Sequence, residues 1–243
     1  MNNIDINEEQ FNLLFCKKIV KPNYTFYYDE ELLDMYDHNY FEVDSLSNNL
    51  LDEIIYVSKE RNYKHIKIVS NNKLNILNNE FEEEIILTLL KNDYALFNIP
   101  KIIDVTYKQI KKDDIYSDLL NFEVTNYGET YGKDFTTRKM KRYLNKAKED
   151  NGLNYFGVYI KNEIIASCYA FYFNNIVGID GLFVKPKYRN KYVASNLIKE
   201  IASFYSSPVF LHASKDETAK ETYYKLGFTN QSEIFNYLKI LKD

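Results

Sequence analysis

The stretch FVKPKYRNKYVASNLIKEIA (residues 183–202) leads from an apolar segment into an amphipathic one through a run of cations. The overlapping IVGIDGLFV (residues 176–184) is a short apolar run rich in β-branched residues, which is typical of a buried strand. After the cations, apolar residues recur at helical spacing and form one stripe. Lysine and arginine normally favour a helix C-terminus, because the macrodipole is negative there. Lys187, Arg189 and Lys191 instead gather at the positive end of the expected helix, which predicts a bound anion at this place.

The composition of the whole chain limits the class of protein. Its 243 residues allow one large domain or two, and 45% of them are hydrophobic, enough for a sizeable core. The formal net charge of −4 gives no global basic field, so we expect no nucleic-acid partner. The polar, acidic start is unlike a signal peptide, and no apolar run approaches the ~20 residues that span a bilayer. The widely separated Cys16 and Cys168 favour a reduced, cytoplasmic protein.

Hydrophobic periodicity and turn residues predict the order of elements in the C-terminal part of the chain. The expected elements are a strand at 101–109, a helix near 111–122, a loop at 126–135, a helix near 136–149, strands at 155–160, 164–173 and 176–184, a helix at 192–205, a strand at 209–214, a helix at 218–226 and a closing strand at 233–241. This order indicates an α+β domain built around a mixed sheet.

Two motifs in this region belong together. The first is Arg189-Asn190-Lys191-Tyr192-Val193-Ala194, in register with the pattern [Q/R]-x-x-G-x-[G/A] except that Tyr192 replaces glycine. The second is N-x-x-A-x-x-x-Y-x-x-x-G-F, filled by Ala219, Tyr223, Gly227 and Phe228, with Asp216 in place of the asparagine. With the order of elements, the two motifs resemble the GNAT superfamily of acyl-CoA N-acyltransferases over roughly residues 102–243.

This resemblance implies a GNAT fold, which is an α+β (α/β-like) fold with a mixed, mostly antiparallel sheet flanked by helices. It also implies that acetyl-CoA is the cosubstrate and that its pyrophosphate is the anion at the helix start, where free N–H groups and cations favour it. The tyrosine at the glycine position predicts weaker binding, because a Cβ hinders close approach of the phosphates. The implied cofactor-binding residues are Leu182, Phe183 and Val184 for the pantetheine arm, and Arg189, Asn190, Lys191, Tyr192, Val193, Ala194 and Asp216.

Acetyl transfer to an amine needs a general acid for the departing thiolate and a way to deprotonate the amine. By the resemblance, Tyr223 is the acid. Three residues are candidates for the base: Asp180, which interrupts an apolar strand where an unpaired carboxylate is costly, His212 on the next strand, and Glu129 in the loop expected to wall the acceptor pocket. Deprotonation through water is a further alternative, since members of this family often use it.

Other chemistries find little support in the sequence. The chain contains no G-x-x-x-x-G-K-[ST] and no G-x-S-x-G. Its cysteines and histidines are not clustered at metal-ligand spacing, so we expect no metal.

Residues 1–100 contain a weak echo of the C-terminal part. Segment 49–54 resembles 196–201 at an offset of 147 positions, and 65–70 resembles 209–214 at an offset of 144. A helix expected at 82–94 would complete the order strand, helix, strand, helix. The residues equivalent to Arg189 and Lys191 are Glu42 and Asp44, which would repel a phosphate. We therefore expect residues 1–100 to be a degenerate GNAT-like half with no CoA site, and residues 101–243 to be the acetyltransferase domain.

The sequence thus predicts a cytoplasmic N-acetyltransferase that moves an acetyl group from acetyl-CoA to a primary amine by direct attack in a ternary complex. The alternative is a non-catalytic acyl-CoA-binding or protein-interaction module. We expect a monomer or homodimer with no nucleic-acid or membrane partner. The acceptor amine cannot be read from the sequence, because specificity in such folds lies in loops without a shared code.

Overall fold

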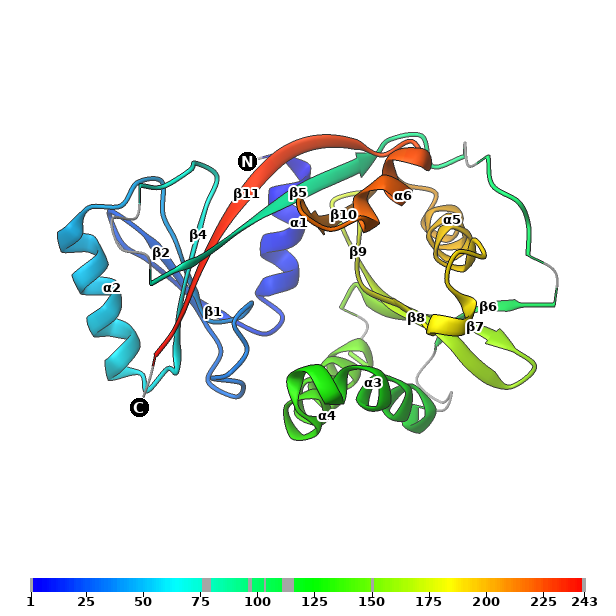
Figure 1. The fold of residues 1–243 in the computed structure, drawn as a ribbon, viewed down its shortest axis with the longest axis horizontal. Coiled ribbons are helices and arrows are strands. Elements are labelled where there is room, and N and C mark those ends of the chain that lie inside the picture. Colours follow the sequence, from blue (N-terminus) through cyan, green and yellow to red (C-terminus); the bar gives the residue numbers. More distant parts are fainter. Residues whose placement is uncertain are drawn as a thin grey trace. The chain divides into compact units, whose positions relative to one another are not determined.

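The computed structural model describes residues 2–75, 80–95, 98–102, 104–110, 116–149 and 151–241. The chain forms two compact units, each assembled from separate segments (Figure 1). Unit 1 comprises Met1–Leu14, Leu89–His212 and Glu221–Thr229, and unit 2 comprises Phe15–Thr88, Ala213–Lys220 and Asn230–Asp243. The strands β5 (Glu82–Lys91) and β11 (Thr229–Ile240) each contain residues of both units. The boundary between the two units therefore does not lie at a single position in the sequence.

Unit 1 is built on five neighbouring strands in the order β10-β9-β8-β7-β6. These are β6 (Thr106–Ile110), β7 (Leu153–Ile160), β8 (Glu163–Phe173), β9 (Ile176–Val184) and β10 (Val209–Ser214). Antiparallel pairing joins β6 to β7, β7 to β8, and β8 to β9, whereas β10 runs parallel to β9. The parallel step needs a crossover, and the helix α5 (Val193–Tyr205) supplies it.

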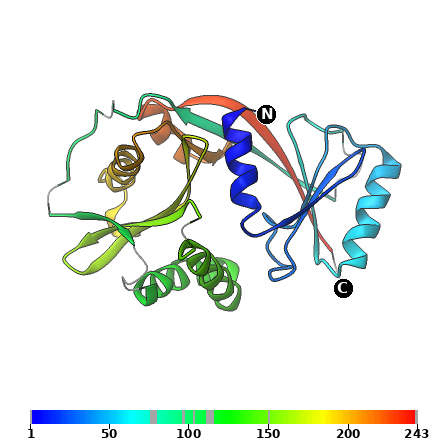
Figure 2. The same ribbon diagram turned by 180° about the vertical axis from the view of Figure 1, so that it is seen from behind.

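Helices cover both faces of this sheet. Within unit 1, α5 lies on one face of the strands, and α3 (Tyr116–Tyr131) and α4 (Lys133–Ala147) lie on the other (Figures 1 and 2). The N-terminal helix α1 (Asn3–Asn12) packs on β8 and β9, and its Phe11 ring contacts Tyr143 of α4 with centroids 6.2 Å apart. A capping box of Asn2 and Asp5 begins α1. The short helices are the 3₁₀ turn Pro186–Tyr188 and α6 (Ala219–Lys225).

Unit 2 has the strand order β1-β2-β3-β4-β11. Its strands are β1 (Lys17–Val20), β2 (Thr25–Tyr28), β3 (Tyr40–Glu42), β4 (His65–Ser70) and the C-terminal β11. The helix α2 (Asn48–Glu60) joins the parallel pair β3 and β4, and β11 runs antiparallel to β4. Its core contains Phe26, Phe41, Leu50, Ile54, Ile66, Ile68 and Tyr237. The C-terminal strand therefore completes the unit that holds most of the N-terminal chain.

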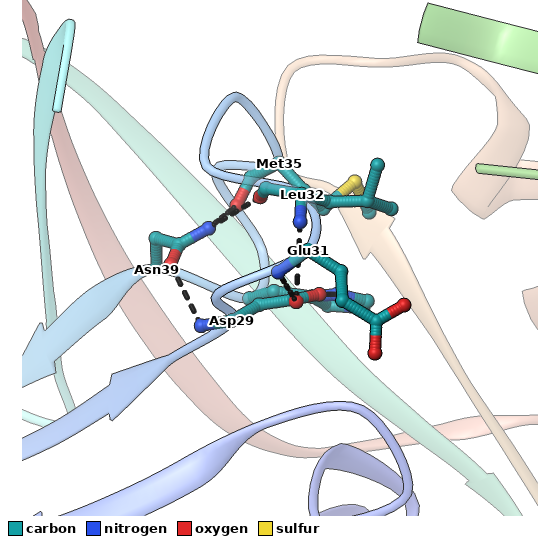
Figure 3. Close-up of polar contacts among 6 residues, drawn as sticks. Asp29, Glu31, Leu32, Met35 and Asn39 are labelled. Atoms are coloured by element: carbon teal, nitrogen blue, oxygen red, sulfur yellow. Dashed lines mark hydrogen bonds and ion pairs between the residues drawn. The ribbon is translucent and has the colours of Figure 1, made fainter. Parts of the chain in front are cut away.

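A buried hydrogen-bond network closes the loop between β2 and β3 (Figure 3). The Asn39 side chain donates to the carbonyls of Leu32 at 2.8 Å and Met35 at 2.9 Å, and accepts from the backbone N–H of Asp29 at 2.8 Å. The Asp29 carboxylate accepts from Glu31 N–H at 2.9 Å. Because these groups satisfy one another, the loop can hold polar side chains in the interior.

Most of the expected elements are present. The strands predicted at 65–70, 176–184 and 209–214 are confirmed residue for residue as β4, β9 and β10. The predicted fold class, an α+β fold with a mixed, mostly antiparallel sheet flanked by helices, is confirmed. The strand expected at 101–109 begins only at Thr106. The beginning of the helix expected near 111–122 includes residues outside the described ones.

Two expectations were wrong. The loop predicted at 126–135 is helical, because α3 continues to Tyr131 and α4 begins at Lys133. A single residue, Gly132 at φ +88°, makes the turn between them, and the left-handed region suits glycine. The helix predicted at 82–94 is instead the strand β5. Its Glu and Leu content favours a helix, but a place in a sheet overrides weak local propensity.

The two units share a strand–helix–strand arrangement. In both β3-α2-β4 and β9-α5-β10 the strands are parallel neighbours joined by a helix. This agrees with the first three elements of the predicted repeat, while the fourth is a strand rather than a helix. The division into residues 1–100 and 101–243 remains a prediction. Of the helices in the described part of the chain, none has the length and apolar character needed to cross a membrane.

Candidate active site

The hydrogen-bonded ladder between β9 and β10 of unit 1 ends partway along β9. Their ladder joins Val177–Ile179 to Val209–Leu211, whereas β9 continues to Val184. At the same level the register between β8 and β9 shifts, which marks a bulge. Gly181 has φ +62° there, and an added Cβ would lie 2.7 Å from the Tyr169 ring, so this position requires glycine. The backbone of Leu182, Phe183 and Val184 thus lies beyond the last rung shared with β10.

A pocket of about 210 Å³ lies where the two strands diverge. Three of the four predicted catalytic residues line it: Asp180 from β9, His212 from β10 and Tyr223 from α6. Tyr127 from α3 lines it as well. The complete lining is Tyr127, Ile179, Asp180, Gly181, Leu182, Leu211, His212 and Tyr223. A phenol, an imidazole and a carboxylate from three elements therefore converge on one small space.

Asp180 is held by two short hydrogen bonds. The Tyr169 hydroxyl donates to Oδ2 at 2.5 Å, and the Gly181 N–H donates to Oδ1 at 2.5 Å. Burial, reinforced by the charge of Asp180, raises the pKa of Tyr169 well above its ordinary value. Tyr169 therefore stays protonated at neutral pH and acts as a fixed donor. The bulge at Gly181 explains how a carboxylate can interrupt this strand without being left unsatisfied.

His212 and Tyr223 approach the pocket from neighbouring elements of the motif region. The Nε2 atom of His212 contacts the carboxylate of Glu8 on α1. Tyr223 is half-buried, and its ring packs edge-on against Phe228 with centroids 6.0 Å apart. The Phe228 N–H donates to the Tyr223 carbonyl at 3.1 Å. The last residues of the second motif thus fix Tyr223.

Glu129, the third candidate base, lies elsewhere. It is exposed on α3, and the described residues that line the pocket do not include it. Tyr127, two positions earlier on the same helix, points to the pocket instead. Because residues 126–131 are helical rather than a loop, neighbouring side chains project in different directions.

The start of α5 carries the first motif. Tyr192 is the N-cap residue in the left-handed conformation (φ 61°, ψ 13°), and its side chain makes no capping bond. The first helical bond runs from Asn196 N–H to the Tyr192 carbonyl at 2.9 Å, so the N–H groups of 193–195 have no partner within the helix. Asn190 also has a positive φ, 58°. Tyr192 is 53% exposed.

The cations beside this helix start bond mainly to backbone. Arg189 Nε donates to the Val184 carbonyl at 3.0 Å, and its guanidinium lies 5.5 Å from the centroid of the Phe183 ring. Lys191 Nζ donates to the Lys187 carbonyl at 2.9 Å. These contacts leave two or more N–H groups on each cation for an anion. Asp216, the remaining predicted cofactor residue, is exposed in the turn before α6 and belongs to unit 2.

Glu123 is a site feature that the sequence reading missed. It lies on α3 one turn before Tyr127, is buried, and accepts a hydrogen bond of 2.5 Å from the Ser167 hydroxyl of β8. Burial raises its pKa to about 7, although Ser167 and the charge of Lys139 oppose the rise. Burial, followed by the charges of Glu123 and Asp180, also raises the pKa of Tyr127. Its place among the apolar residues of α3 is the feature of the sequence that could have revealed Glu123.

Comparisons with known proteins agree with this geometry. Residues 116–228 match the model of the Acetyltransferase (GNAT) family. This segment contains the strands β7 to β10, the start of α5 and Tyr223. For residues 116–228, this match confirms the resemblance to the GNAT family that the two motifs indicated. No curated protein is similar enough to count as a match.

Solved structures share the fold at low sequence identity. A functionally unknown conserved protein from Staphylococcus epidermidis ATCC 12228 has a TM-score of 0.81 at 16% identity, with 93% of this chain and 95% of that chain covered. A GCN5-related N-acetyltransferase from Kribbella flavida has a TM-score of 0.68 at 11% identity, covering 97% and 94%. A tandem GNAT protein from the clavulanic acid biosynthesis pathway has a TM-score of 0.56 at 8% identity, covering 91% and 80%. These similarities show the fold alone.

Proposed function

We propose that the protein is an N-acetyltransferase that transfers an acetyl group from acetyl-CoA to a primary amine. The observation that carries the proposal is the convergence of Asp180, His212 and Tyr223 on one pocket where β9 separates from β10. A thioester carbonyl placed in this pocket would meet a carboxylate, an imidazole and a phenol. Acyl transfer to an amine needs these kinds of group: a proton acceptor for the nucleophile and a donor for the leaving thiolate.

Acetyl-CoA fits the surroundings of the pocket. Its diphosphate would lie at the start of α5, where N–H groups of 193–195 and the helix dipole favour an anion. Arg189 and Lys191 would add charge-assisted hydrogen bonds. The pantetheine amides would pair with backbone groups of Leu182–Val184, which lie beyond the ladder with β10. Tyr192 already has the left-handed backbone suited to glycine, so the cost of its side chain is steric and conformational, not a different loop path.

The proton balance assigns roles to the lining residues. The acceptor ammonium gives one proton to a base, and its nitrogen forms a bond to the acetyl carbonyl carbon. The C–S bond then breaks while Tyr223 donates its hydroxyl proton to the thiolate, and the second proton that the nitrogen loses restores the Tyr223 hydroxyl. Overall, an ammonium and a thioester become an amide, a thiol and one released proton. Asp180 and His212 are the candidate bases within the pocket, and Asp180 also attracts a cationic amine.

A non-catalytic acyl-CoA-binding or protein-interaction module is the second candidate. Two departures from the motifs favour it, the aromatic side chain of Tyr192 at the helix start and Asp216 in place of asparagine. The acetyltransferase and an acyl-CoA-binding module would share the same CoA site, so binding alone does not separate these two. In either case we propose a cytoplasmic protein, monomeric or homodimeric, in which residues 1–100 contribute no CoA site.

Two measurements on the full-length chain test the proposal. Calorimetry measures acetyl-CoA binding, and release of the CoA thiol is followed with a panel of glycine, spermidine, kanamycin and a peptide with a free α-amine. Binding at one site together with turnover of one of these amines supports the acetyltransferase. Binding without turnover of any amine favours the module. Absence of binding contradicts the acetyltransferase and the acyl-CoA-binding module, and favours a protein-interaction module.

A further inference from the structure

The N-terminal helix α1 is anchored on the sheet of unit 1 at two levels. The buried Asn7 amide donates to the carbonyls of Phe173 at 2.9 Å and Ile176 at 2.8 Å, in the turn between β8 and β9. One helical turn later, the Phe11 ring stacks on Phe171 with centroids 4.2 Å apart and an interplanar angle of 18°. These contacts join residues more than 150 positions apart and fix the helix against the strand that leads to the pocket.

Glu8, which lies between these anchors, contacts a residue that lines the pocket. Its carboxylate contacts Nε2 of His212, which lines the pocket with Asp180 and Tyr223. The two side chains are 32% exposed for His212 and 27% for Glu8, so solvent screens their interaction only in part. Because Asn7 and Phe11 flank Glu8, the position of the carboxylate follows from the packing of the helix.

A carboxylate at one ring nitrogen of a histidine has two chemical effects. It keeps the ring proton on that nitrogen, so the other nitrogen is the one that takes up a proton. It also stabilises the imidazolium that forms. In the arrangement that we propose, Glu8 holds the ring proton on Nε2 and Nδ1 takes up the proton of the amine. The imidazole of His212 beside Glu8 would be more basic and better oriented than that of a histidine without a carboxylate neighbour.

The other groups around the pocket are less suited to this role. Asp180 on β9 already accepts hydrogen bonds from Tyr169 and Gly181 on its two oxygens. The phenol of Tyr127 on α3 has a pKa raised by burial and by the charges of Glu123 and Asp180, so it is a donor at neutral pH. Tyr223 on α6 is needed as the acid. Among the kinds of ionisable side chain that line the pocket, an imidazole is the one whose ordinary pKa lies nearest neutral pH, which favours His212 as the proton acceptor.

We propose that Glu8 of the N-terminal helix is a positioning residue that orients His212 to take the proton of the acceptor amine. This inference rests on the proposed function and assigns its base. It also gives α1 a part in catalysis, although the helix lies more than 100 positions before the family match at 116–228.

The test compares two matched substitutions on one helix. Glu8→Gln removes the charge and keeps the size of the side chain, and Glu9→Gln makes the same change one position later. The chain has three histidines, of which His38 and His65 are buried, so NMR of the ring C–H groups can follow His212. In Glu8→Gln the titration midpoint of His212 should move to lower pH. With the amine that turns over best, kcat should fall about tenfold or more while KM changes little.

Glu9→Gln should leave both the His212 titration and kcat near their wild-type values. In a His212→Gln background, adding Glu8→Gln should cost no further activity, because the two residues act as one unit. An unchanged titration or an unchanged kcat in Glu8→Gln would overturn the proposal, as would equal effects of Glu9→Gln. The titration requires no turnover. A moved titration in a chain that acetylates none of the amines would overturn the catalytic role while leaving the Glu8–His212 contact established.

Discussion

The helix starts of β3-α2-β4 and β9-α5-β10 differ more than their topologies. In unit 2, Ser47 caps α2 by accepting from Leu50 N–H at 3.2 Å, and two acidic residues, Glu42 and Asp44, precede it. In unit 1, α5 begins at Tyr192 without a side-chain cap and follows a run of cations. In a capped helix, a side chain of the same protein already accepts from one of the first N–H groups. In an uncapped helix, all of these N–H groups can donate to a ligand.

The strand pairs beside these helices also differ, in how far along each strand the pairing extends. The β3–β4 ladder ends with Glu42 opposite Val69, and a further bond from Val43 N–H to the Val69 carbonyl extends it to the end of β3. The β9–β10 ladder ends at Ile179 although β9 continues to Val184. In unit 1 the strands separate and the helix start is uncapped and positively charged, and these are the features on which the proposed CoA site depends. This supports the view of residues 1–100 as a half without a CoA site.

Removing residues 1–100 is expected to have the largest effect. The deletion takes away β4, to which β11 pairs from Phe235 to Ile240, and α1, whose Phe11 covers Phe171. An unpaired strand edge and an exposed aromatic face promote aggregation. Fragment 101–243 should therefore be insoluble or inactive, as judged by size-exclusion chromatography and CoA release. A soluble fragment with full CoA affinity would show that the two halves are independent.

The next effect concerns catalysis. Tyr223→Phe removes one hydroxyl and almost no volume, so the half-buried ring should keep its contact with Phe228. If Tyr223 protonates the thiolate, kcat should fall about 100-fold while CoA affinity is unchanged. Tyr224→Phe is the matched control, because the neighbouring tyrosine is exposed and does not line the pocket. Full turnover by Tyr223→Phe would assign Tyr223 to packing.

Reversing a charge at the α5 start tests the anion site directly. Arg189→Glu should weaken CoA binding about 30-fold, or about 2 kcal/mol, because an attraction becomes a repulsion. The reciprocal change in unit 2, Glu42→Arg with Asp44→Lys, should not create a second site, because α2 is capped by Ser47 and its strands do not separate. Calorimetry gives both affinity and stoichiometry. Unchanged affinity in Arg189→Glu would contradict the assignment of the CoA site.

The sequence predicted most accurately those features that depend on residues close together in the chain. Strands β9 and β10 are apolar runs bounded by turn residues, so their limits were predicted, and motif register then placed Tyr223. The contact of Glu8 with His212 joins residues 204 positions apart, which no local pattern reveals. The β5 segment shows the converse, since its composition favours a helix and only its place in the fold makes it a strand. Glu129 was misplaced because Gly132 shortens the turn to one residue.

Buried carboxyl groups in the two units have different kinds of partner. In unit 2 the buried Asp29 carboxylate lies 2.8 Å from the His38 ring, whereas in unit 1 Glu123 accepts from a serine hydroxyl. Burial raises the pKa of Glu123 to about 7 from an ordinary 4.5, so the folded state holds this proton more tightly than the unfolded state. The resulting stability is complete below about pH 4.5 and is lost as the pH rises through about 7.

Glu123→Gln should therefore be more stable than the wild type at pH 8.5 by on the order of 2 kcal/mol, and no more stable at pH 4.5. The amide oxygen can still accept from Ser167. Glu129→Gln, on the exposed side of the same helix, should leave the pH dependence of unfolding unchanged. Urea unfolding at the two pH values measures the difference. Equal stability of wild type and Glu123→Gln at pH 8.5 would mean that Glu123 ionises in the folded protein at little cost.

The smallest expected effect lies at Tyr192, where the two helix starts can be made more alike or less so. A non-glycine residue in the left-handed region costs roughly 1–2 kcal/mol of strain, and glycine there costs about 0.5–1 kcal/mol through the unfolded chain. Tyr192→Gly should thus change the free energy of unfolding by less than about 1 kcal/mol. With the ring removed, the N–H groups of 193–195 become easier for a diphosphate to approach, so CoA should bind several-fold more tightly. Ser47→Gly in unit 2 removes the cap of α2 but introduces no cations, and it should leave CoA affinity and the stoichiometry of one unchanged. Weaker CoA binding in Tyr192→Gly would show that the exposed phenol is itself a ligand contact, and that this chain has replaced the glycine of the motif by a different means of holding the cosubstrate.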